Sequence, residues 1–316
     1  MRLYIDKENI HSFISGKNND IDLFDESVRL IKKGMEVYYN FPKAEALSDP
    51  ALMAWFSKMR GSGVKFEHTF CPDATVKPER PIKSNFYNNY DSEDRGSIYL
   101  LNIEENICSN VKDKRAILIG RPGEEFEIFK MLLDIPERVG MMYQIKSWGD
   151  YIPKIPLSDA IICDNHYFKN KRVYEKNKNE LIMALASIPK DSFNLVIITK
   201  EGEIDNAIDL EKECDNIKNT VCSVSGLSKK KCAVTLMTTY STHSRHIITN
   251  YYYIAPTSCV HLVDNALKED ADISILPHTD TNAVEKTKSL IKTFQGIVNS
   301  KGRIYGDKKS NFLIFE

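Results

Sequence analysis

Residues 2–9, RLYIDKEN, begin as four residues suited to a buried strand and then turn abruptly to acids and an amide. Segments of alternating helical and strand character follow, at residues 21–33, 35–39, 48–59 and 64–70. Ser48 is the expected N-cap of the helix at 48–59, because Pro50 falls in its first turn. This order of strands and helices is typical of a mostly parallel sheet that helices cover.

The stretch at residues 71–95 interrupts this rhythm, because three prolines fall there among polar residues. It predicts a long loop, a kind of segment that is often functional. The pattern then resumes with elements expected at residues 98–103 (strand), 104–110 (helix), 116–119 (strand), 120–123 (turn) and 124–133 (helix).

A second α/β pattern begins after Gly149. The expected strands lie at residues 160–163, 195–199, 232–239, 246–254, 272–276 and 311–315, and the expected helices at 178–188, 207–217 and 282–299. We therefore expect an α/β protein of two domains, residues 1–149 and 150–316, with the long loop in the first.

Composition excludes several classes of protein. The 316 residues carry 43 Lys and Arg against 44 Asp and Glu, which argues against a generally basic nucleic-acid coat and against an acidic tail. No apolar run approaches the length of a membrane span, and acids stand where a secretion signal needs an apolar core. The seven cysteines include no C-x-x-C pair, so reduced thiols in a cytoplasmic protein are expected rather than a zinc cluster.

Acids follow three of the expected strands in the first domain. Asp6 ends the first strand, Glu104 follows the strand at 98–103, and Glu124 and Glu125 follow the turn after the strand at 116–119. The carboxyl ends of parallel strands meet at one edge of a sheet, where such folds bind ligands. Because carboxylates suit Mg²⁺ and Mn²⁺, we expect a site for one of these ions there.

Three segments of the first domain, residues 4–9, 99–104 and 117–126, resemble the NYN branch of the PIN-like ribonucleases. The resemblance implies a PIN-like fold over roughly the first 135 residues. It also implies that Asp6, Glu104, Glu124 and Glu125 are catalytic metal ligands and that Asn9 orients them. The family has Asp at turn positions that are Glu here. The other interpretation is that these acids are solvated strand ends and helix N-termini, with no metal.

The second domain contains the sequence HSRHIITN, residues 243–250, which has the form H-x-R-x-x-x-x-N. It is similar to the H-x-K-x-x-x-x-D pattern of the phospholipase D superfamily, and the resemblance implies that His243 attacks phosphorus while Arg245 and Asn250 help to bind phosphate. Because two copies normally build one site, the single copy predicts a homodimer or a partner within a complex. Alternatively, the His and Arg bond turn carbonyls and are structural.

Other polar segments leave alternatives open. Lys229 and Lys230 either meet phosphates or form a solvated edge. The sequence Asp-Asn-His at 164–166 either joins His243 in one cleft or forms a turn. Aromatic residues within the loop at 71–95 either stack on the bases of single-stranded RNA or pack back on the domain.

The sequence thus favours metal-dependent phosphodiester hydrolysis on nucleic acid, with single-stranded RNA as the expected partner and Mg²⁺ or Mn²⁺ as the cofactor. The alternative is a protein without catalytic activity that binds nucleic acid or nucleotides, or acts as a scaffold, and is built from degenerate nuclease folds. A third interpretation is an effector that senses a nucleotide at the carboxyl edge of a sheet.

Overall fold

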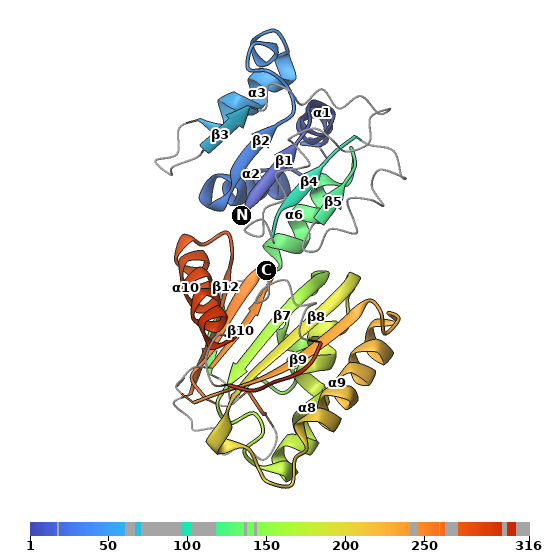
Figure 1. Ribbon diagram of the computed structural model, residues 1–316. Coiled ribbons are helices and arrows are strands. Elements are labelled where there is room, and N and C mark those ends of the chain that lie inside the picture. The colour runs from blue at the N-terminus through green and yellow to red at the C-terminus, as the bar shows by residue number, and fades with distance from the viewer. Residues whose placement is uncertain are drawn as a thin grey trace. The chain divides into compact units, whose positions relative to one another are not determined.

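The computed structural model describes residues 1–17, 19–60, 67–70, 96–102, 118–135, 138–141, 144–240, 245–258, 260–262, 271–298 and 302–307. The chain forms two compact units. The first contains Met1–Asp134 and His278–Thr281, and the second contains Ile135–Pro277 and Asn282–Glu316 (Figure 1). Each unit has its own sheet and helices, which makes the protein an α/β protein.

The first unit is built on a five-stranded parallel sheet. The strand order is β3 (Glu67–Phe70), β2 (Glu36–Tyr39), β1 (Arg2–Ile5), β4 (Ile98–Leu100) and β5 (Leu118–Gly120). Its helices are α1 (Lys7–Gly16), α2 (Ile21–Gly34), η1 (Glu45–Leu47), α3 (Pro50–Met59) and α6 (Glu125–Leu133). From β1 the chain adds β2 and β3 on one side of the sheet, and it then adds β4 and β5 on the other side. The position between β1 and β4 is therefore a topological switch point, where open α/β sheets bind ligands.

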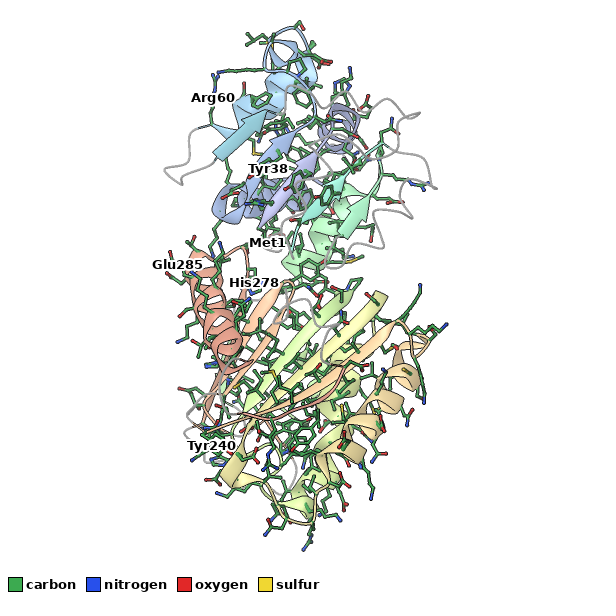
Figure 2. The ribbon with its side chains drawn as sticks, viewed as in Figure 1. Met1, Tyr38, Arg60, Tyr240, His278 and Glu285 are labelled. Atoms are coloured by element: carbon green, nitrogen blue, oxygen red, sulfur yellow. The ribbon has the colours of Figure 1, made fainter. Side chains whose placement is uncertain are left out.

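Aromatic side chains pack at the centre of this sheet, and one of them, Tyr38, is labelled in Figure 2. The ring of Tyr4 on β1 stacks on Tyr38 of β2 at 4.8 Å and on Tyr99 of β4 at 4.4 Å. The buried Trp55 of α3 donates a hydrogen bond from Nε1 to the hydroxyl of Tyr39, 3.0 Å away. The three central strands therefore share one continuous row of stacked rings, which fixes their register.

The second unit is built on an eight-stranded mixed sheet. The strand order is β13 (Ile304–Gly306), β9 (Cys232–Thr239), β8 (Pro189–Lys200), β7 (Leu157–Asp164), β10 (Arg245–Thr249), β11 (Tyr252–Pro256), β12 (Asp272–Pro277) and β6 (Arg138–Met141). Only the two pairs β7–β8 and β8–β9 are parallel among these described strands.

Helices α8 (Lys171–Ala186) and α9 (Leu210–Ser225) connect the three parallel strands and pack together, as Figure 1 shows. The shorter α7 (Trp148–Tyr151) precedes β7, and η3 (Glu201–Glu203) lies between β8 and α9. Helix α10 (Thr281–Val298) packs Phe294 against one face of the sheet, on a cluster that includes Ile161, Val196 and Met237. The buried Trp148 donates from Nε1 to the carbonyl of Val260 at 2.9 Å.

Several expectations from the sequence need correction. The boundary expected after residue 149 falls after Asp134 in the structure, because β6 pairs with β12 and so belongs to the second unit. The stretch 246–254 is not one strand but a hairpin of two strands, β10 and β11. Asp49, not Ser48, caps α3, since its carboxylate accepts from the N–H groups of Ala51 and Leu52.

Some expected elements lie outside the described residues: the loop at 71–95, the helix at 104–110 and the strand at 311–315. None of the helices that the structure describes is both long and apolar enough to cross a membrane.

Candidate functional site

Asp6 lies at the switch point of the first sheet and is only 3% exposed. Its Oδ1 accepts hydrogen bonds from the backbone N–H and the side-chain amide of Asn9, both at 2.9 Å, and so caps α1. Its Oδ2 accepts from the backbone N–H of Asn102, just beyond β4, while its own N–H donates to Leu100. One carboxylate therefore joins the ends of β1 and β4 to the start of α1.

Glu125 approaches from the other side, as the first residue of α6 after β5. Its Oε2 accepts from the N–H of Gly123 at 2.9 Å and from the hydroxyl of Ser12 on α1 at 3.3 Å. Gly123 has a φ of 99°, a conformation that a residue with a side chain rarely adopts. The side chain of Glu125 is 1% exposed, so the short turn and α1 together bury a carboxylate.

Two buried oxygen atoms near this point have no hydrogen-bond donor within the described part of the chain. They are Oε1 of Glu125 and Oδ1 of Asn9. Asn9 and Ser12 are three residues apart on α1 and so lie on one side of that helix. Because buried acceptors normally have a donor, water or an ion, these two atoms mark a place suited to a positively charged or donating ligand.

The pKa shifts of Asp6 and Glu125 also favour a cation at this point. Burial raises the pKa of Asp6 above its usual value, although hydrogen bonds from Asn102 and Asn9 counteract this. Burial also raises the pKa of Glu125, and the negative charge of Asp6 raises it further. A cation at this point would relieve the electrostatic cost of keeping both groups ionised.

The side-chain oxygens of Asp6, Asn9 and Glu125 are hard ligands of the kind that Mg²⁺ and Mn²⁺ prefer. Among the described residues no three His, Cys, Asp or Glu side chains are grouped as metal ligands, and Glu104 lies outside those residues. Glu124 is not brought to the pair: its side chain is exposed and accepts from the N–H of Arg121 at 3.0 Å.

The residues predicted to bind phosphate in the second unit lie at opposite ends of its strands. Arg245 begins β10 opposite Asp164, at the carboxyl end of β7. Asn250 follows the other end of β10, and Lys229 and Lys230 are exposed just before β9, at its amino end. Because β10 runs antiparallel to β7 and β9 runs parallel to it, Asn250 and the lysines cannot join Arg245. His243 lies outside the described residues.

The two residues of the motif that are described have protein partners. Nη1 of Arg245 donates to the carbonyl of Thr257 at 3.3 Å, and its Nε lies 3.9 Å from Oδ1 of Asp164. Oδ1 of the buried Asn250 accepts from the N–H groups of Ser158 and Asp159, both at 2.9 Å. The side chain of Asn250 therefore stabilises the fold through these hydrogen bonds.

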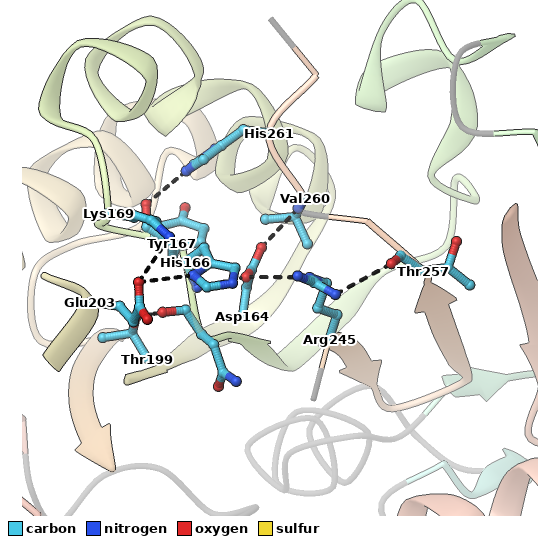
Figure 3. A network of polar contacts seen from close by, with 11 residues as sticks. Asp164, His166, Tyr167, Lys169, Thr199, Glu203, Arg245, Thr257, Val260 and His261 are labelled. Atoms are coloured by element: carbon cyan, nitrogen blue, oxygen red, sulfur yellow. Dashed lines mark hydrogen bonds and ion pairs between the residues drawn. The ribbon is translucent and has the colours of Figure 1, made fainter. Parts of the chain in front are cut away.

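Of the two alternatives for residues 164–166, the structure shows the turn, and the cleft shared with His243 lies outside the described residues. Oδ1 of the fully buried Asp164 accepts from the N–H of His166 at 2.9 Å, and its Oδ2 accepts from the N–H of Val260 at 2.8 Å (Figure 3). The sequence did not reveal the residues that surround this turn, because they come from separate elements: Lys169 from the turn itself, Glu203 from η3 and His261 from beyond β11. Nothing in their local spacing predicts that they meet.

No protein-family model matches the sequence, and no curated protein matches it. Among solved structures, the chain is similar to one described as "Structure of TrmBL2, an archaeal chromatin protein, shows a novel mode of DNA binding". The identity is 10%, the TM-score is 0.29, and the match covers 55% of this chain and 58% of that chain. A likeness this low carries no argument about fold or function.

Proposed function

We propose that the first unit hydrolyses phosphodiester bonds of nucleic acid, with single-stranded RNA as the substrate and Mg²⁺ or Mn²⁺ as the cofactor. The observation that carries the proposal is the pair of buried acceptor atoms, Oε1 of Glu125 and Oδ1 of Asn9, near Asp6 at the switch point of a parallel sheet. A site that collects unpartnered oxygens where such folds bind ligands is suited to a hard cation.

Each residue has a separate task in this proposal. Asp6 and Glu125 would hold the ion, and Asn9 would fix the orientation of Asp6 through its amide. Ser12 and the N–H of Gly123 hold Glu125 in place through its Oε2, which leaves Oε1 for the ion. A bound Mg²⁺ or Mn²⁺ supplies activation of water and neutralisation of charge on the phosphodiester.

The test is a single-stranded RNA cleavage assay with Mn²⁺, run with a chelator control and alongside thermal melts with and without the ion. We expect Glu125→Gln to lower cleavage by about 100-fold or more and to abolish the rise in melting temperature that Mn²⁺ causes. Glu124→Gln is the matched control, because Glu124 is the neighbouring but exposed carboxylate. Cleavage by Glu125→Gln at the rate of the parent would refute the metal site.

One observation favours the alternative, a binding or scaffolding protein without catalytic activity. Both oxygens of Asp6 already accept hydrogen bonds from backbone N–H groups, those of Asn9 and Asn102. Asp6 therefore also stabilises the fold in a way that needs no ion. On this alternative, Mn²⁺ leaves the melting temperature of the parent unchanged while RNA or a nucleotide still binds.

A dimer, proposed from the single copy of the His243 motif, is tested separately by sedimentation at micromolar concentration.

A further inference from the structure

A second polar cluster lies at the carboxyl ends of the parallel strands β7 and β8, where antiparallel β10 adjoins β7 (Figure 3). The turn after β7 is fastened in place there. The hydroxyl of Thr199 donates to the carbonyl of Asn165 at 3.2 Å, and Nε2 of the buried His261 donates to the carbonyl of Tyr167 at 2.7 Å. The cluster is therefore a preorganised feature of the sheet edge that binds ligands in α/β folds.

Three positive or protonatable groups converge on one carboxylate, that of Glu203 in η3. Nζ of Lys169 lies 3.0 Å from Oε2 of Glu203, Nδ1 of His166 lies 3.5 Å from the same atom, and Nζ of Lys200 lies 3.8 Å from Oε1. These neighbours, Lys169 first, lower the pKa of Glu203. The side chains of Lys169, His166 and Lys200 therefore stabilise negative charge at the position of the Glu203 carboxylate.

Two buried nitrogen atoms of the cluster form no hydrogen bond with the described residues. They are Nε of Arg245 and Nδ1 of His166. The 3.5 Å contact of His166 with Glu203 is an ion-pair distance only. Asp164 does not satisfy Arg245, because the distance of 3.9 Å is too long for a hydrogen bond and its oxygens accept from the N–H groups of His166 and Val260. A buried donor that lacks an acceptor destabilises the folded protein, so a ligand that brings an acceptor to this point would be stabilised.

Positive charge exceeds negative charge among the described residues of this cluster. The positive side chains are those of Lys169, Lys200 and Arg245. The negative ones are those of Asp164 and Glu203. The missing partner is thus an acceptor that carries negative charge.

We propose that the second unit binds a phosphate monoester at this edge, through Lys169, Lys200, His166 and Arg245, and that Glu203 is the internal anion with which the ligand competes. A monoester phosphate suits the cluster because it has three terminal oxygens and up to two negative charges, against one charge for Glu203 or for a phosphodiester. Two sources share this chemistry: a free mononucleotide and the 5′-phosphate end of an RNA strand.

The experiment measures binding to the full chain by calorimetry with four probes: inorganic phosphate, adenosine monophosphate, and a short single-stranded RNA with either a 5′-phosphate or a 5′-hydroxyl. We expect Lys169→Ala to weaken binding of the phosphate-bearing probes by about fivefold or more. Glu203→Gln should instead tighten it by a similar factor, because it removes the competing charge. Lys288→Ala, an exposed lysine on α10, is the control and should leave binding unchanged.

Opposite signs for two substitutions in one cluster distinguish a ligand site from a structural ion-pair network. In a purely structural network both substitutions lower the melting temperature and neither changes binding, and that result would overturn the proposal. Absence of binding of every phosphate probe at millimolar concentration, by the parent and by Glu203→Gln, would overturn it too. If only the 5′-phosphorylated RNA binds, the source is a strand end; if adenosine monophosphate binds equally well, it is a mononucleotide.

Discussion

The side chain of Asn250 connects the turn after β10 to the start of β7. Oδ1 accepts from the N–H groups of Ser158 and Asp159, and Nδ2 donates to Oδ2 of Asp159 at 3.4 Å. The buried Asp159 also accepts hydrogen bonds from two neutral groups, the hydroxyl of Ser158 and the amide of Asn194. The structure thus explains why an amide suits this position: it both accepts and donates.

We expect Asn250→Asp to destabilise the second unit by about 2–4 kcal/mol, because it places a second buried carboxylate against Asp159 and removes a donor. Chemical denaturation at neutral pH measures the change. The exposed Asn206→Asp carries the same change of charge and should leave the free energy of unfolding nearly unaltered. Equal stability of the two variants would contradict the role assigned to Asn250.

At the scale of the elements, Asp49 has a double role at the start of α3. Its Oδ1 accepts from the N–H groups of Ala51 and Leu52, and its Oδ2 is hydrogen-bonded to His11 of α1 at 2.8 Å. The hydroxyl of Ser48 instead donates to the carbonyl of Glu45, so it does not cap the helix. Asp49 therefore also links α3 to α1.

We expect Asp49→Ala to lower the melting temperature by about 2–4 °C and Ser48→Ala to lower it by less, because only Asp49 caps α3. The two variants are compared in the same thermal melt at neutral pH. A larger loss in Ser48→Ala would reverse the assignment of the cap.

Local patterns predicted most of the described elements. The strands at 2–5 and 232–239 and the helix at 21–34 follow directly from runs and spacing of apolar residues. Helix α1 was missed, because its start depends on Asp6 acting as a cap within a run of polar residues. The hairpin within 246–254 was missed because three consecutive tyrosines hid the turn, which Thr249 stabilises by accepting from the N–H groups of Tyr251 and Tyr252.

The candidate sites were predictable only in part, for a related reason. Asp6 and Glu125 follow strands of one sheet, so sequence order alone placed them at a common edge. The burial of Glu125 and the exposure of Glu124 depend on the turn at Gly123, which the order of residues does not reveal. The cluster around Glu203 depends on the sheet order of the second unit, which sequence neighbours do not encode.

At the scale of the whole molecule, the two units contain buried groups that respond oppositely to acid. In the first unit, burial raises the pKa values of Asp6 and Glu125, so protonation of these groups favours folding. In the second unit, burial lowers the pKa of His246 to about 4, with a further contribution from Lys286, and burial also lowers the pKa of His261. Protonation of these histidines favours unfolding.

The contribution of His246 should be fully present above pH 6.5, its ordinary pKa, and should be lost as the pH falls toward about 4. His246→Gln removes the titration and keeps an acceptor for the hydroxyl of Tyr253, which lies 2.7 Å from Nδ1. We therefore expect the melting temperature of the parent to fall relative to that of this variant as the pH falls from 6.5 to 4. A difference that stays constant over this range would show that His246 does not titrate differently on folding.

The placement of the two tryptophans gives each unit its own fluorophore. The sequence contains two of them, and Trp55 is buried in the first unit while Trp148 is buried in the second. Each indole lies in an apolar interior, so its emission shifts to longer wavelength when the surrounding unit unfolds and admits water. In Trp148→Phe the emission reports on the first unit alone, and in Trp55→Phe on the second, so that every effect of ion, phosphate or acid described above can be assigned to the unit in which it arises.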